Sequence, residues 1–138
     1  MNKDIISLKI PRKPDYISLI RLTTSGIGNS MALSIDDIED IKVSIGEACI
    51  NALMLNEKEE ILIVFEIEEE RLTVKVTGVK EEIHDHIEDK KERQLGLLII
   101  KSLMDKVEFT ENGIKMIKYI EDDNQWLIKV KKREMQKT

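Results

Sequence analysis

The sequence predicts an α+β fold, with a mostly antiparallel sheet and helices on one of its faces. Two pairs of alternating apolar segments, at residues 61–77 and 107–120, are each joined by a turn short enough for a β-hairpin. Amphipathic helices precede the first pair, and another lies between the pairs. Hairpins with helices inserted between them are typical of a sheet that carries its helices in one layer, so the opposite sheet face is free to meet solvent or a partner.

Composition limits the function classes. A length of 138 residues predicts one domain over residues 1–138, and the 41% of hydrophobic residues supports a folded core. A net charge of −5 argues against a nucleic-acid partner, because nucleic-acid binders usually present a basic face. No apolar segment approaches the roughly 20 residues that cross a bilayer. With Cys49 as its single cysteine and no signal-peptide pattern, the chain is expected in the cytoplasm, with no membrane partner.

The first elements are a strand and two helices. Residues 4–11 alternate between polar and apolar up to Pro11, which ends the strand because proline cannot donate to a sheet. After Pro14 a helix is predicted. Its apolar stripe consists of Ile17, Ile20, Thr24 and Ile27. Ser34 and the acids after it predict the start of a second helix at about residues 35–55, since serine caps helices and acids favour the positive helix end.

The remaining elements follow from alternation and charge. Residues 61–67 and 71–77 predict the first hairpin, and Asn112-Gly113 predicts the turn of the second. Between them, ten of the fourteen residues 80–93 are charged, which indicates a loop or an exposed helix. Helical spacing then returns, with an apolar stripe at Leu95, Leu98, Ile99 and Leu103. We expect a last edge strand at residues 126–130 and a flexible tail at residues 131–138.

The second predicted helix carries two polar residues, Glu47 and Asn51, on a side that is otherwise apolar. Its predicted core stripe consists of Ile38, Ile41, Ile45, Ala48, Cys49 and Ala52. Glu47 and Asn51 point the other way, flanked by Val43, Ile50 and Met54. Two interpretations stay open. The pair is either exposed helix surface, or the wall of a pocket in which a carboxylate acts as a general base and a carboxamide oxygen binds magnesium.

A family resemblance adds to this pattern. The segments IEDIKVSIGEACINAL, RLTVKV and LGLLIIKSLMDKVEF, together with PDYISLIRL before them, resemble the serine-protein kinase anti-sigma factors. These are bacterial regulators of general-stress and sporulation sigma factors within the GHKL family of ATPases. The likeness covers residues 5–120 and implies a Bergerat-type two-layer α/β sandwich. It also implies that Glu47 is the catalytic base and that Asn51 holds magnesium against the phosphates of ATP.

The chain departs from the family at the positions that hold the nucleotide. The family's adenine-recognising aspartate and nearby glycine fall at Gly78 and Lys80, and glycine has no side chain to accept that hydrogen bond. The glycine-rich turn that closes over the phosphates is replaced by Arg93 and Gln94, and only Gly96 is kept. The corresponding lid, residues 78–94, is short and charged. These departures predict that binding of Mg-ATP is weakened or lost.

Two functional hypotheses follow. The first is an anti-sigma-factor-like regulator that binds a sigma factor or an anti-anti-sigma protein, with Arg21 at the position of a partner-contacting arginine in the family; the alternative is a surface arginine with no such role. The second is an active Mg-ATP-dependent kinase in which Glu47 deprotonates a serine hydroxyl of an antagonist. The resemblance also implies a homodimer. His84 and His86 have no evident third ligand, so a metal site is not favoured there and their role stays open.

Overall fold

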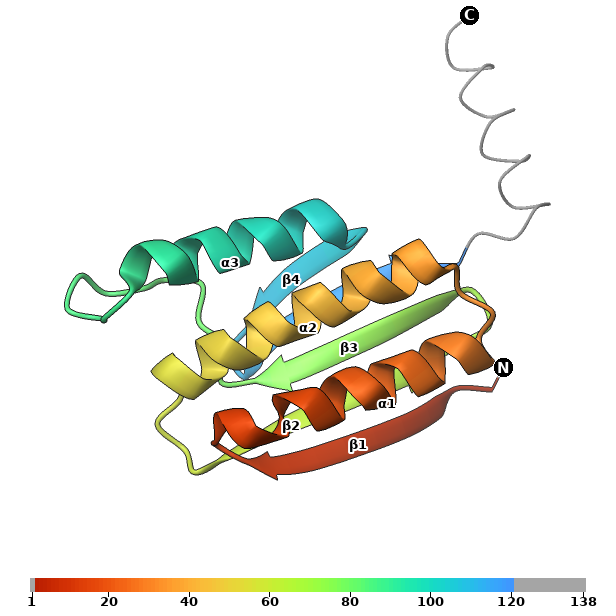
Figure 1. Ribbon diagram of the computed structural model, residues 1–138, viewed down its shortest axis with the longest axis horizontal. Coiled ribbons are helices and arrows are strands. Elements are labelled where there is room, and N and C mark those ends of the chain that lie inside the picture. Colours follow the sequence, from red (N-terminus) through yellow and green to blue (C-terminus); the bar gives the residue numbers. More distant parts are fainter. Residues whose placement is uncertain (1, 121–138) are drawn as a thin grey trace, which may run out of the picture.

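The computed structural model describes residues 2–120 and confirms the α+β class (Figure 1). A single-turn 3-10 helix at Pro14–Tyr16 precedes the first α-helix. The helices are α1 (Ile17–Ser30), α2 (Ile35–Leu55) and α3 (Lys90–Leu103), and the strands are β1 (Asp4–Pro11), β2 (Glu60–Ile67), β3 (Arg71–Thr77), β4 (Lys106–Thr110) and β5 (Gly113–Tyr119). The five strands form one antiparallel sheet in the order β1-β2-β3-β5-β4. The edge strand expected at residues 126–130 and the tail at 131–138 lie outside the described residues.

Strand alternation separates the two faces of the sheet. On β2 and β3 the helix-facing side chains are all fully or almost fully buried: Ile61, Ile63, Phe65, Leu72, Val74 and Val76. The opposite face carries Leu62, Val64 and Lys75, which are half-buried. The three helices lie side by side over one face only (Figure 1). The prediction of helices in one layer is therefore confirmed.

Helix α2 has the predicted bounds and the predicted buried face. The Ser34 hydroxyl oxygen accepts a hydrogen bond of 3.0 Å from the backbone N–H of Asp37, which is the expected N-terminal cap. All six residues of the predicted core stripe are buried. Burial raises the pKa of the Cys49 thiol to about 12, against a smaller opposing effect of the nearby Arg21 charge. Across residues 2–120, no helix combines the length and the hydrophobicity that a membrane span requires.

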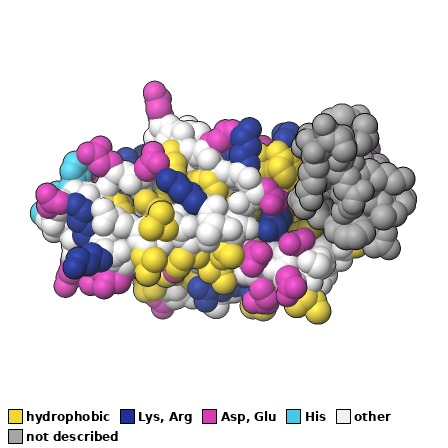
Figure 2. Space-filling view, turned by 90° about the horizontal axis from the view of Figure 1, so that it is seen from above, with side chains coloured by type: hydrophobic (Ala, Val, Ile, Leu, Met, Phe, Trp, Pro, Cys, Tyr) yellow, Lys and Arg dark blue, Asp and Glu magenta, His cyan; other side chains and the backbone are white. Residues whose placement is uncertain are grey.

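Helix α3 differs from its prediction in its buried face. It begins at Lys90, so the charged stretch 80–93 is part loop and part helix. Its buried residues are Gly96, Leu97 and Ile100, whereas Leu95 is 56% exposed and Leu98 is 62% exposed. The predicted stripe was therefore wrong at Leu95 and Leu98, whereas its other two members, Ile99 and Leu103, are half-buried. Figure 2, which looks down from the α3 side of the molecule, shows hydrophobic side chains at the surface among charged ones.

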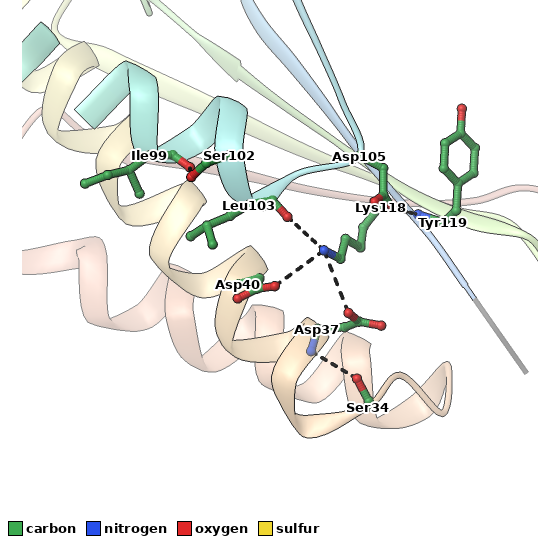
Figure 3. Close-up of polar contacts among 9 residues, drawn as sticks. All are labelled: Ser34, Asp37, Asp40, Ile99, Ser102, Leu103, Asp105, Lys118 and Tyr119. Atoms are coloured by element: carbon green, nitrogen blue, oxygen red, sulfur yellow. Dashed lines mark hydrogen bonds and ion pairs between the residues drawn. The ribbon is translucent and has the colours of Figure 1, made fainter. Parts of the chain in front are cut away.

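A buried lysine joins three elements at one end of the molecule (Figure 3). The ammonium of Lys118, on β5, donates hydrogen bonds to the backbone oxygen of Leu103 at 2.8 Å and to Asp40 Oδ2 at 3.5 Å. It also forms an ion pair with Asp37 Oδ1 at 3.7 Å. Because Leu103 ends α3 and both aspartates lie near the start of α2, this cluster ties both helices to the sheet.

Candidate functional site

Glu47 and Asn51 of α2 face α3 and the loop of residues 78–89. Asn51 is 1% exposed, so the interpretation that both residues are ordinary exposed surface is wrong for Asn51. The Glu47 carboxylate lies against the α-carbon of Gly96, where a side chain on Gly96 would collide with it. The missing side chain at position 96 therefore lets α3 pack directly on α2 beside Glu47.

The Asn51 carboxamide bonds to the backbone of a single loop residue. Its Nδ2 donates to the carbonyl oxygen of Lys80 at 3.1 Å, and its Oδ1 accepts from the backbone N–H of Lys80 at 3.0 Å. A magnesium ion on Oδ1 would lie next to that N–H, whose positive hydrogen repels a cation. In this arrangement the carboxamide is engaged by the loop.

Gly78 has a structural reason to be glycine. Its φ of +81° is a left-handed conformation that side-chain-bearing residues rarely adopt. A Cβ there would lie 2.5 Å from Cγ of Asn56, whose own amide donates to the Glu60 carbonyl at 3.2 Å. The Gly78 N–H donates to the carbonyl of Asn112 in the β4–β5 turn at 2.9 Å. An aspartate at position 78 does not fit this arrangement.

Arg93 and Gln94 lie in the first turns of α3, where the resembling family has a glycine-rich turn. The Arg93 N–H bonds to the Asp89 carbonyl at 3.0 Å, as in a helix start. The Arg93 side chain is 13% exposed, and its Nη1 lies 3.6 Å from Glu47 Oε2. That distance is too long for a hydrogen bond, and within the described part of the chain Nη1 has no hydrogen-bond partner. Gln94 is exposed.

A cavity of about 730 Å³ lies beside the loop, between its outer side and the end of α2. Lys80, His84 and His86 line it, whereas Glu47 and Asn51 do not. The two histidine rings stack with their centroids 5.6 Å apart. In residues 2–120 there is no group of three or more histidine, cysteine, aspartate or glutamate side chains that could hold a metal ion.

Arg21 lies apart from these groups, in the seam between α1 and α2. Its guanidinium covers Gly46, since a Cβ at position 46 would lie 2.5 Å from Arg21 Nη2. Arg21 is exposed, and its neighbours in sequence Leu19 and Leu22 are 47% and 70% exposed. Helix α1 thus exposes a guanidinium at its seam with α2 and two apolar side chains elsewhere on its surface.

These contacts do not fit Mg-ATP in the way that the resemblance implies. The amide that would bind magnesium is bonded to Lys80, the position for adenine recognition is a left-handed glycine against Asn56, and a helical turn with Arg93 stands where phosphates would be closed in. Glu47 keeps a carboxylate that is 24% exposed. The structure thus brings Glu47, Asn51, Lys80, Arg93 and Gly96 together, and contacts within the chain engage them.

Comparison with known proteins identifies relatives over most of the chain. Residues 10–118 match the family described as histidine kinase-like ATPase domain. The chain is 38% identical to proteins named serine-protein kinase RsbW from Bacillus cereus and Bacillus thuringiensis. It is 37% identical to the protein of that name from Bacillus mycoides. Each alignment covers 84% of this chain and 85% of the relative.

Proposed function

Because the chain belongs to the histidine kinase-like ATPase domain family, we propose that it is a regulator of the anti-sigma-factor type. In this proposal it binds a sigma factor or an anti-anti-sigma protein in the cytoplasm, and its ATP binding and kinase activity are weakened or lost. Relatives named serine-protein kinase RsbW match 84% of the chain, which supports retention of the fold and of a partner surface. The same resemblance makes a homodimer part of the proposal.

The observation that carries the proposal is that residues expected to hold the nucleotide contact other residues of the same chain instead. Asn51 forms two hydrogen bonds with Lys80, and the Glu47 carboxylate has Arg93 as its nearest charged neighbour. A residue kept for chemistry needs its reacting atoms free to meet the substrate. The engaged Asn51 carboxamide therefore favours a binding function over phosphoryl transfer.

The outer surface of α1 is the proposed partner surface. The Arg21 guanidinium lies against Gly46 and stays exposed, so it can pair with a partner carboxylate. Leu19 and Leu22, on other sides of the same helix, are exposed apolar side chains that a partner covering α1 could also contact. An acidic partner segment with apolar residues would satisfy both features.

The test measures capture of a purified general-stress sigma factor, and separately of an anti-anti-sigma protein, by surface-immobilised chain. Arg21→Ala removes the charge and Arg21→Lys keeps the charge but loses the two-pronged donor geometry. Lys9→Ala, at an exposed position on β1, is the matched control. We expect Arg21→Ala to weaken capture at least about tenfold, Arg21→Lys to weaken it less, and Lys9→Ala to leave it unchanged.

Glu47→Ala separates binding from chemistry. The proposal expects this variant to capture its partner as well as the original chain does, with or without Mg-ATP. If instead capture requires Mg-ATP and disappears with Glu47→Ala, or if neither protein is captured at all, the binding-regulator proposal is wrong.

A second candidate function is the active serine-protein kinase. Two observations favour it: the Glu47 carboxylate is still 24% exposed, and Arg93 Nη1 has no hydrogen-bond partner in the described region. Such a guanidinium nitrogen could receive a phosphate oxygen. Transfer of labelled phosphate from Mg-ATP to an anti-anti-sigma protein, abolished by Glu47→Gln, would establish this candidate in place of the first.

A further inference from the structure

We infer that Asn51 is a latch: it holds the loop of residues 78–89, here called the latch loop, closed against α2 without any nucleotide. This inference rests on the proposed function and deepens it, because it assigns to the residue expected to bind magnesium a different role in this chain. The juxtaposition that carries it is the Asn51 carboxamide against the backbone of Lys80.

The two Asn51 hydrogen bonds are reciprocal, and the side chain that forms them is 1% exposed. One side chain satisfies both the N–H and the carbonyl of Lys80, at 3.0 and 3.1 Å, as a neighbouring strand would do. If these bonds break while the loop stays in place, no water replaces them, and the buried carboxamide is left unpaired. That cost opposes the first small displacement of the loop.

Further contacts fix the loop on either side of Lys80. Val79 is 3% exposed and Ile83 is 6% exposed, and both belong to the hydrophobic core. Gly78 bonds through its N–H to the carbonyl of Asn112. The segment around Lys80 is thus anchored by apolar burial as well as by hydrogen bonds, so the latch closes a loop that is already positioned.

Helix α3 also contacts the latch loop close to Lys80. Gly96 allows α3 to lie against the Glu47 carboxylate, and Arg93 approaches the same group. Lys101 of α3 pairs with Glu81 of the loop at 3.4 Å. The loop and α3 therefore close on α2 together, with Asn51 at the point where the loop backbone meets the helix.

A closed latch changes what the site can bind. A cation could use Asn51 Oδ1 freely only after the Lys80 N–H has moved away, so any metal-bound nucleotide competes with the loop. When the competent state is a small fraction of the protein, the apparent affinity falls by that fraction. While the latch is closed, the chain is expected to bind its protein partner equally well with and without nucleotide.

Amide hydrogen exchange of residues 79–83, followed by mass spectrometry, tests the latch. Asn51→Ala removes both bonds, and Asn51→Asp keeps an acceptor for the Lys80 N–H but loses the donor to its carbonyl. Asn29→Ala, at an exposed position on α1, is the control. We expect the Lys80 amide to exchange about ten to a hundred times faster in Asn51→Ala, less so in Asn51→Asp, and unchanged in the control.

The original chain provides a test that needs no variant. With millimolar Mg-ATP, exchange of the Lys80 amide is expected to stay as it is without nucleotide. Faster exchange on adding Mg-ATP would mean that Asn51 leaves the loop for the metal, and equal exchange in the original chain and Asn51→Ala would mean that Asn51 does not hold the loop. The first result overturns the claim that the latch stays closed in the presence of nucleotide, and the second overturns the latch itself. Partner capture is measured separately, so a failed latch and a failed binding function are distinguishable.

Discussion

Two polar clusters lie along α2, and their contacts differ. Near the start of the helix, Lys118 has a carbonyl and two carboxylates around it (Figure 3). Farther along, Arg93 approaches only Glu47, at 3.6 Å, and one of its nitrogens has no hydrogen-bond partner in residues 2–120. A cluster whose groups are mutually satisfied serves stability, whereas a cluster with an unsatisfied buried cation is a candidate for binding or for a lost function.

Helix dipoles reinforce this difference. Asp37 and Asp40 lie near the positive start of α2, and the Lys118 ammonium meets the carbonyl that ends α3. Each charge is therefore favoured by the helix end that it touches. Glu47 is in the middle of α2, where the dipole gives no such help, so its environment depends on α3 and the latch loop.

The largest expected effect on stability comes from placing the family's aspartate at position 78. Gly78→Asp forces a side chain into a left-handed conformation and against Asn56. We expect a loss of about 3 kcal/mol in the free energy of unfolding from the two costs together. Urea denaturation measures it. A variant as stable as the original chain, with new affinity for ATP, would show that the backbone at Gly78 does not exclude an aspartate.

Removing the cation of the satisfied cluster should have the next largest effect. Lys118→Met keeps most of the apolar stem but leaves the Leu103 carbonyl and two aspartates without their partner, and we expect a loss of about 2 kcal/mol. Lys115→Met, three residues earlier on the same strand with its side chain on the opposite sheet face, is the control, with little change expected. Equal losses in both variants would contradict the stabilising role.

Removing the cation of the unsatisfied cluster should cost little. Arg93→Met deletes a guanidinium that is poorly paired and mostly buried, so the lost ion pair and the relieved burial offset each other. We expect the free energy of unfolding to change by less than about 1 kcal/mol. If Arg93→Met lost as much free energy of unfolding as Lys118→Met, both clusters would stabilise the fold to the same extent, which contradicts the comparison.

The apolar side of α2 gives a pH prediction. The folded Cys49 thiol has a pKa of about 12, raised from an ordinary value of 9.0 by burial. Between these values the unfolded chain releases the thiol proton and the folded chain does not, so this residue lowers stability as pH rises above 9.0. At pH 8 the folded protein should not react with a disulfide reagent, whereas the protein unfolded in guanidinium should react at once; fast reaction of the folded protein would contradict the burial.

Local signals in the sequence predicted α2 in full. The Ser34 cap, the acids after it and the apolar spacing all depend on residues within a few turns of one another, so no tertiary knowledge was needed. The same reasoning did not predict the buried face of α3. Residues 97–100 are all apolar, so the spacing of apolar residues alone does not show which side of the helix is buried. Packing against α2 at Gly96 made that choice.

The contacts that define the candidate site are long-range, and the sequence does not show them. Asn51 meets Lys80 and Asn56 meets Gly78 only after the sheet brings the end of β3 next to the end of α2. A glycine directly after a strand was the one available signal of a left-handed turn. The resemblance explains Gly78 only as a missing aspartate, whereas its left-handed backbone is an independent reason for glycine. Lys118 gave no signal that set it apart from the many exposed lysines.

Calorimetric titration of the purified chain with Mg-ATP tests the central claim most directly, namely that contacts within the chain have closed the nucleotide site. The account predicts no detectable binding up to millimolar nucleotide, together with unchanged capture of the protein partner. Micromolar binding of Mg-ATP by the original chain would contradict it.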